Sequence, residues 1–250
     1  MVSSPASSSS ASIQTNSDQN KPDRANSEPT AHDVGLYSSP IGKKLLTGLT
    51  GLGLVTFVIA HVLGNLTLFF SASAYNQLAH FIESWGFALY LVEGALLVMV
   101  CVHAAIGISI YWGKRQARQI AYAEYESRGT PSRQTLASRT MIVSGLLLGV
   151  FLVAHLATFK FGKIYTVPGS GDRDLARLVF ETFQRPGYTA GYVVILSFLG
   201  LHLRHGIWSA LQSLGLATKP AVFAASAVLG GAIAAGFIGL PLAIYFGWIG

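Results

Sequence analysis

The chain has 250 residues, of which 51% are hydrophobic and only 11% are charged, and its formal net charge is +6. Soluble domains contain about 25% charged residues, so this composition excludes an ordinary soluble domain and is typical of a protein that crosses a membrane several times. The single cysteine, Cys101, excludes an intramolecular disulfide, a CxxC metal pair and an iron–sulfur cluster bound by this chain.

The chain divides into a polar tail and an apolar domain. Residues 1–37 are rich in Ser, Asn, Asp and Pro, so we expect them to be disordered. Residues 38–250 contain five apolar segments of about 20 residues or more, the length that a bilayer core requires. These segments cover 44–70, 86–112, 140–159, 188–211 and 221–248. The sequence therefore predicts an all-α polytopic membrane protein, whose fifth, small-residue-rich span favours close helix packing.

Basic residues predict the orientation of the spans. Lys43 and Lys44 precede the first span, and the connection between the first and second spans has no Lys or Arg. Six basic residues fill the connection between the second and third spans: Lys114, Arg115, Arg118, Arg128, Arg133 and Arg139. Because Lys and Arg are enriched on the cytoplasmic side, we expect a cytoplasmic N-terminus in the inner (cytoplasmic) membrane and an outer C-terminus. We therefore expect the net positive charge to set the orientation of the spans and to dock a partner protein, and we expect no nucleic-acid partner.

Two connections contain predicted short helices on the outer side. Leu175, Leu178, Val179 and Phe183 recur at helical spacing, which predicts a helix lying on the membrane surface. Residues 71–85 form the other.

The first four spans each carry histidine inside an apolar run. They are His61, His103, His155 and, in the fourth span, both His202 and His205. An imidazole is costly to bury in hydrocarbon without a partner, so four consecutive occurrences indicate a shared site rather than unrelated core histidines bonded to neighbouring helices. A zinc or di-iron carboxylate site fits poorly, because acidic residues within the spans are nearly absent.

The predicted topology sorts the histidines into two levels. His61 and His155 lie in the outer halves of their spans, whereas His103, His202 and His205 lie in the inner halves. The levels are on the order of 12 Å apart if each histidine lies about four residues from mid-span. Facing helices can supply the two axial imidazoles of a haem iron. We therefore expect a four-helix bundle with two bis-histidine haems, which carry electrons because no coordination position stays open.

An internal repeat links the first and third spans. Gly51, preceded by a threonine, stands ten residues before His61, and Gly145, preceded by a serine, stands ten residues before His155. Ten residues of helix rise about 15 Å, so a missing side chain there could make room for a planar ligand at the second level. Contact between small residues of packed helices is the alternative.

Several polar residues are candidates for proton transfer or charge pairing. Asn76, His80 and Glu83 share one face of the helix predicted at 71–85. The His80 imidazole and the Glu83 carboxylate could exchange protons with a quinone near the outer haem, and a solvated interfacial helix is the alternative. Glu93 in the second span is a further candidate, with helix capping or an interhelical hydrogen bond as its alternative. Arg204 lies too deep for a casual surface charge, so we expect it to pair with a haem propionate.

Three segments resemble a known family. They are SSPIGKKLLTGLTGLGLVTFVIAHVLGNL, AYNQLAHFIESWGF and HLRHGIWSALQSLG, and they occur in this order between about Ser38 and the C-terminus. With them the chain is similar to the b558-type cytochrome b subunits, which anchor succinate dehydrogenases and some fumarate reductases through five helices and two b haems.

The resemblance implies ligands and partners. His61 and His155 would ligate the distal haem, and His103 and His202 the proximal haem. The family's HxxxG pattern favours His202, although depth alone slightly favours His205, which would then lie near a propionate. Glu83 would match an acidic residue near the quinone. A flavoprotein subunit would oxidise succinate in the cytoplasm, and an iron–sulfur subunit would relay the electrons to this chain, which would reduce menaquinone or another quinone.

Two other functions remain open at this stage. A di-haem cytochrome b of a hydrogenase or formate dehydrogenase would share the bundle, but it would lack the AHF and HxxxGxWS segments. A haem-free membrane transporter would use the histidines to move protons.

Overall fold

The computed structural model describes residues 39–117, 140–216 and 219–250. Within these ranges five helices are long and apolar enough to cross a membrane, which confirms the predicted all-α polytopic fold. They are α1 (Pro40–Leu66), α3 (Phe87–Ala117), α5 (Met141–His155), α7 (Pro186–Ser213) and α8 (Pro220–Tyr245). The predicted tail and four of the basic residues used for orientation lie outside the described residues: Arg118, Arg128, Arg133 and Arg139.

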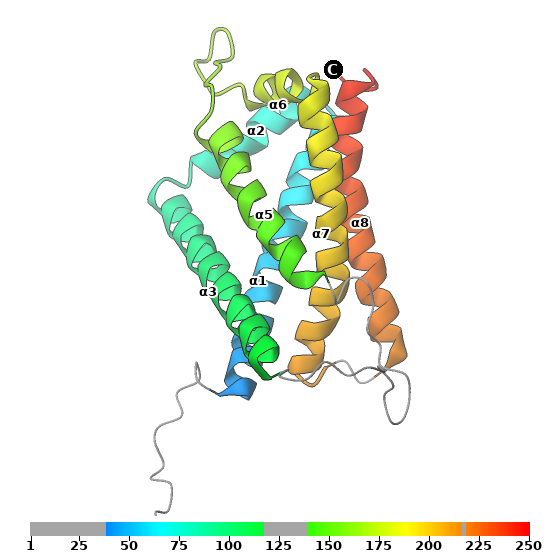
Figure 1. Cartoon of the computed structure of the whole chain (residues 1–250). Helices are drawn as coiled ribbons and strands as arrows, with labels where there is room; N and C mark the ends of the chain where they lie inside the picture. Colours follow the sequence, from blue (N-terminus) through cyan, green and yellow to red (C-terminus); the bar gives the residue numbers. More distant parts are fainter. Residues whose placement is uncertain (1–38, 118–139, 217–218) are drawn as a thin grey trace, which may run out of the picture. The chain divides into compact units, whose positions relative to one another are not determined.

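Shorter elements extend or connect these helices. The 3-10 turn η1 (Thr67–Phe69) continues α1, and the π-helical turn η2 (Leu156–Lys160) continues α5. Two short helices, α2 (Ala72–Glu83) and α6 (Leu175–Phe183), lie across the same end of the bundle (Figure 1). The described residues hold no strand, only an isolated bridge between Thr166 and Arg173.

Local signals explain where the helices begin. Pro40, Pro186 and Pro220 open α1, α7 and α8. Proline suits the first turn because its missing N–H has no partner within the helix there. The Ser39 hydroxyl caps α1 by accepting a hydrogen bond from the Gly42 backbone N–H at 2.9 Å, and Ser71 caps α2 in the same way.

The first four spans form a closed ring. α1 contacts α3, α3 contacts α5, α5 contacts α7, and α7 contacts α1 (Figure 1). In this order α1 stands diagonally opposite α5, and α3 stands diagonally opposite α7. α8 packs on the outside of the ring against α7 and α1. α8 and α7 approach each other closely, as the small residues of the fifth span predict. A Cβ added to Gly230 of α8 would lie only 2.9 Å from the Arg204 backbone nitrogen of α7.

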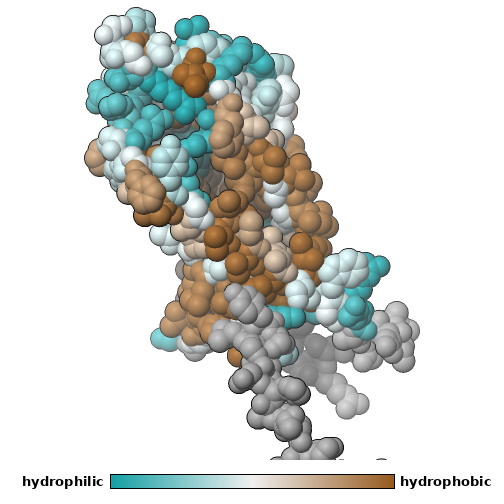
Figure 2. Space-filling view, turned by 90° about the vertical axis from the view of Figure 1, so that its left-hand side faces the viewer, coloured by the Kyte–Doolittle hydropathy of each residue, from teal (hydrophilic) through white to brown (hydrophobic). Residues whose placement is uncertain are grey.

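The outward surface of the spans is apolar. Phe87, Val150 and Val228 are 75%, 72% and 72% exposed on three different spans, and Figure 2 shows an apolar band between polar ends. Such a surface suits hydrocarbon, in which helices satisfy their own backbone hydrogen bonds. The chain is therefore a multi-pass membrane protein.

We call α2, α6 and the connection 161–174 the cap. α6 confirms the helix predicted at 175–183, but its apolar side packs against protein rather than lying on the membrane surface. Val179 and Phe183 are buried with Leu68 of η1 and with Leu240 and Ile244 of α8. The correction follows from geometry: η1 and α8 end beneath the cap, so residues of η1 and of the last turns of α8 cover the apolar side of α6.

Candidate functional site: two histidine pairs inside the bundle

The ring of helices brings four histidines together in two pairs. The cap-side pair is His61 of α1 and His155 of α5, with ring centroids 5.8 Å apart. The far pair is His103 of α3 and His202 of α7, with ring centroids 6.3 Å apart. Each pair joins diagonally opposite helices, so its rings meet in the interior of the ring.

These separations suit two imidazoles on opposite faces of one metal ion. Metal–imidazole bonds are about 2 Å long, and each ring centre lies roughly 1 Å behind its ligating nitrogen, so the centroids of two axial ligands are about 6 Å apart. No cluster of three or more His, Cys, Asp or Glu side chains occurs within the described ranges. A bare metal ion would therefore lack ligands at either pair, whereas a haem brings four nitrogens and needs only two more. The residues present fit a haem at each level.

Hydroxyl groups lie beside the Nδ1 atoms of three of the four histidines. The distances are 3.0 Å between His202 and Ser144, 3.2 Å between His155 and Tyr192, and 3.4 Å between His103 and Thr50. Metal-binding histidines usually form a hydrogen bond through one ring nitrogen and bind the metal through the other. Here Nδ1 takes the hydrogen bond, which leaves Nε2 for a metal.

The repeated glycines lie against the far pair. A Cβ on Gly51 would lie 3.1 Å from Cε1 of His103, and a Cβ on Gly145 would lie 3.6 Å from Cε1 of His202. The nearest atoms are therefore imidazole atoms, not a neighbouring backbone. The histidines on the helices of these two glycines belong to the cap-side pair. The glycines themselves leave space beside the far-pair histidines, which lie on other helices.

Neither His205 nor Arg204 makes a ring contact or hydrogen bond with the histidine pairs. The His205 ring contacts the Trp208 ring of the same helix in a tilted arrangement, with centroids 5.9 Å apart. The Arg204 guanidinium carbon lies 5.7 Å from the centre of the Phe223 ring on α8. Its Nε atom is buried, with no hydrogen-bond partner in the part of the chain that the structure describes. A buried unpaired donor is costly, which leaves this nitrogen available to an acidic group from outside the chain.

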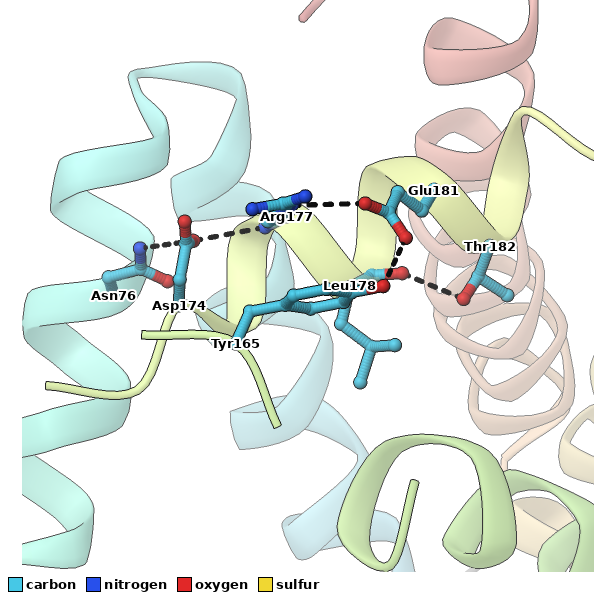
Figure 3. Close-up of polar contacts among 7 residues, drawn as sticks. All are labelled: Asn76, Tyr165, Asp174, Arg177, Leu178, Glu181 and Thr182. Atoms are coloured by element: carbon cyan, nitrogen blue, oxygen red, sulfur yellow. Dashed lines mark hydrogen bonds and ion pairs between the residues drawn. The ribbon is translucent and has the colours of Figure 1, made fainter. Parts of the chain in front are cut away.

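Asn76 fastens α2 to the start of α6 (Figure 3). Its Nδ2 donates to Asp174 Oδ1 at 2.8 Å, and its Oδ1 accepts from the Ala176 backbone N–H at 2.9 Å. Asp174 Oδ1 also caps α6 by accepting from the Arg177 backbone N–H at 3.1 Å. One amide side chain thus uses both its donor and its acceptor to orient α6.

His80 and Glu83 lie on the same side of α2 and face the cap connection. His80 Nδ1 is 3.7 Å from Asp172 Oδ1, and Glu83 Oε1 is 3.5 Å from Arg173 Nη1. Arg173 also donates through Nη2 to the Phe159 carbonyl at 2.6 Å, and the Phe159 ring is centred 5.2 Å from the α5 histidine of the cap-side pair. A continuous series of contacts therefore links Glu83 with that pair.

Three features of the site have no clear signal in the sequence. The π-helical turn η2 begins directly after His155, a kind of irregularity that is frequent at functional sites. Tyr192 reaches His155 from a different helix. Lys160, at the end of η2, pairs with Glu93 of α3, so the one acidic residue predicted within a span has a cationic partner. The aromatic and basic residues were present in the sequence, but their partners depend on helix packing.

A second polar cluster of the cap consists of Tyr165, Arg177 and Glu181 (Figure 3). Glu181 accepts hydrogen bonds from the Tyr165 hydroxyl and from Arg177 Nε, the latter at 3.0 Å. These two hydrogen bonds, with that of Tyr165 the larger cause, lower the pKa of Glu181 below its ordinary value of 4.5. The charged form is therefore favoured in the folded cap.

Replacing Glu181 with glutamine is expected to lower thermal stability slightly near pH 7. A carboxylate whose pKa is lowered by folding contributes stability above its unfolded pKa and loses it as the pH falls through the folded pKa. The difference in midpoint temperature between wild type and Glu181→Gln should therefore be constant above pH 4.5 and shrink below it. A Gln77→Ala control should show a difference that does not change with pH. A Glu181 difference that grows on acidification would contradict the assignment.

No protein-family model matches the chain, and no curated protein or solved structure matches it either. Its function therefore has to be inferred from the histidine pairs, the cap and the sequence segments already described.

Proposed function

We propose that this chain is the cytochrome b membrane anchor of a succinate:quinone oxidoreductase. His61 and His155 would hold one haem, and His103 and His202 would hold the other. The observation that carries the proposal is the pair of centroid separations, 5.8 Å and 6.3 Å, each between histidines of diagonally opposite spans. Haem with two histidine ligands supplies one-electron redox chemistry and offers no open position to a substrate.

The chain's own residues prepare both levels. The spans present apolar side chains to lipid. Thr50, Ser144 and Tyr192 restrain three of the imidazoles through Nδ1. Gly51 and Gly145 leave the far-pair rings unobstructed on one side. Two levels along one bundle suit the passage of electrons across the membrane between a soluble donor and a quinone.

Support for the particular complex comes from the three segments that resemble b558-type subunits. They imply a flavoprotein subunit with the dicarboxylate site, an iron–sulfur subunit that delivers electrons, and menaquinone or another quinone as acceptor. The histidine pairs alone would suit a cytochrome b of a hydrogenase or formate dehydrogenase equally well. The AHF and HxxxGxWS segments favour succinate dehydrogenase.

The test is to purify the complete complex from native membranes through a tag on this chain and to identify its subunits by mass spectrometry. A flavoprotein, an iron–sulfur protein and succinate-dependent quinone reduction are expected. Copurification with hydrogenase or formate dehydrogenase subunits would support the cytochrome b of that complex instead. A haem-free chain without soluble partners would support a transporter.

The cap is the proposed site of quinone chemistry, with Glu83 and His80 as its proton-exchanging groups. Glu83→Gln is expected to keep both haems and to slow succinate:quinone turnover by about tenfold or more, because general acid–base groups contribute at least this much. Turnover is measured in membranes with a soluble quinone. Glu181→Gln makes the same chemical change elsewhere on the cap and should leave turnover within about twofold of wild type. Unchanged turnover in Glu83→Gln would remove Glu83 from the mechanism.

A further inference from the structure

The far pair has a hydroxyl beside Nδ1 of both of its histidines, whereas the cap-side pair has one only beside His155. Thr50 on α1 and Ser144 on α5 occupy equivalent places in the internal repeat, each directly before a glycine. Both hydroxyls face Nδ1 of a far-pair histidine on a different helix. Resting on the proposed function, we propose that Thr50 and Ser144 are positioning residues that fix the tautomer of the far-pair ligands and lower the reduction potential at that level.

The hydrogen-bond inventory of Ser144 decides the direction of its bond to His202. Ser144 is 1% exposed, so no water shares its bonds. Its hydroxyl donates its one hydrogen to the Met141 carbonyl at 3.1 Å. Toward His202 Nδ1, 3.0 Å away, the oxygen can then only accept. Nδ1 therefore carries the proton, and Nε2 keeps the lone pair that a metal requires.

Thr50 gives the same result for His103. Its hydroxyl donates to the Leu46 carbonyl at 2.7 Å, so toward His103 Nδ1, at 3.4 Å, it accepts. Because the Thr50 contact, at 3.4 Å, is longer than the Ser144 contact, at 3.0 Å, its loss should matter less than the loss of the Ser144 hydroxyl.

The cap-side pair is arranged differently. His155 Nδ1 faces the phenol oxygen of Tyr192 at 3.2 Å. In the structure's described ranges the His61 ring makes aromatic contacts with Phe57 and Phe237 and no hydrogen bond. An acceptor on Nδ1–H makes the imidazole more basic and favours the oxidised metal ion. With an aliphatic hydroxyl acceptor on each of its two ligands, the far level would gain this stabilisation of the oxidised state from both.

The experiment is an equilibrium redox titration of the purified complex, with the far component identified as the one lost in His103→Leu. Ser144→Ala is expected to make reduction of the far component about fivefold more favourable, a rise of about 40 mV at 59 mV per factor of ten for one electron. Thr50→Val should give a smaller rise. The other component should stay in place, and Ser144→Thr and Thr50→Ser should remain near wild type.

Matched controls separate this role from general packing. Ser226→Ala removes a hydroxyl that is equally buried but bonded only to the Val222 carbonyl. Thr56→Val removes a more exposed hydroxyl on the helix of Thr50, whose acceptor is the Leu52 carbonyl. Neither control should change the reduction potential of either haem component. Loss of only the far component in Ser144→Ala, with its retention in Ser144→Thr, also supports the proposal.

An unmoved far component in Ser144→Ala, or equal shifts of both components, would overturn this role of Thr50 and Ser144 while leaving the two-haem proposal intact. The absence of haem from the wild-type complex would overturn both.

Discussion

Replacing His155 with leucine is expected to remove one of two haem signals and to leave the other unchanged. Replacing His61 should remove the same signal, because the two rings lie 5.8 Å apart as one pair. His103→Leu and His202→Leu should each remove the second signal instead, because their rings form the far pair. Haem content per chain and the reduced-minus-oxidised spectrum of the purified complex measure both effects.

His205→Leu is the matched control for these variants. It removes an imidazole from the same helix as His202, but the His205 ring contacts Trp208 and not the far pair. Both signals should therefore remain. The His61→Leu/His155→Leu double variant should resemble either single variant, because in the proposal both residues hold one haem. Different losses in His61→Leu and His155→Leu would show that the pairs are wrongly assigned.

The second large effect is expected from filling the glycine spaces beside the far pair. In Gly145→Leu the new Cβ would already lie 3.6 Å from His202 Cε1, and the rest of the leucine side chain would extend beyond it. In Gly51→Leu the Cβ would lie 3.1 Å from His103 Cε1. Because interiors are close-packed, the imidazole has to move, so each variant should lose the far haem and keep the cap-side haem.

Each glycine variant has a control with the same substitution. Gly149 lies on the helix of Gly145, Gly107 lies on the helix of His103, and a Cβ at either position would meet nothing within 4 Å. Gly149→Leu and Gly107→Leu should therefore keep both haems. If Gly145→Leu and Gly51→Leu also keep both, the glycines are not needed to make room for the far-pair ligands.

The spans could be predicted from the sequence because length and apolar composition are local properties. Each of the five helices agrees with its predicted range to within five residues at either end. The candidate histidines could be identified for a similar reason, since an imidazole in an apolar run stands out by its desolvation cost. The alternation of crossings then placed His61 level with His155, and His103 level with both His202 and His205, without any knowledge of packing.

The remaining features depend on contacts between distant residues. Asn76 and Asp174, whose hydrogen bond joins the cap, are 98 residues apart, and nothing local to α2 indicates that partner. The choice between His202 and His205 depends on the rotation of α7, because three residues turn a helix by about 300°. α6 was recognised by its spacing, but whether lipid or protein covers its apolar side depends on where η1 and α8 end.

The glycine repeat shows both the reach and the limit of the sequence. Its spacing predicted glycines at the second level, and Gly51 and Gly145 lie there beside the far pair. The atoms that fill the space, which belong to His103 and His202, come from two other helices. The residue before each glycine, Thr50 or Ser144, has a hydroxyl that lies beside an Nδ1 atom of the far pair. This contact is visible only in the structure.

The most direct test of the central claim is the haem-to-protein ratio of the purified wild-type complex, measured together with its reduced-minus-oxidised spectrum. Two haems per copy of this chain, both with low-spin b-type bands, are expected. A ratio near zero, or bands of a haem with an open coordination position, would contradict the assignment of His61, His155, His103 and His202 as two pairs of axial ligands.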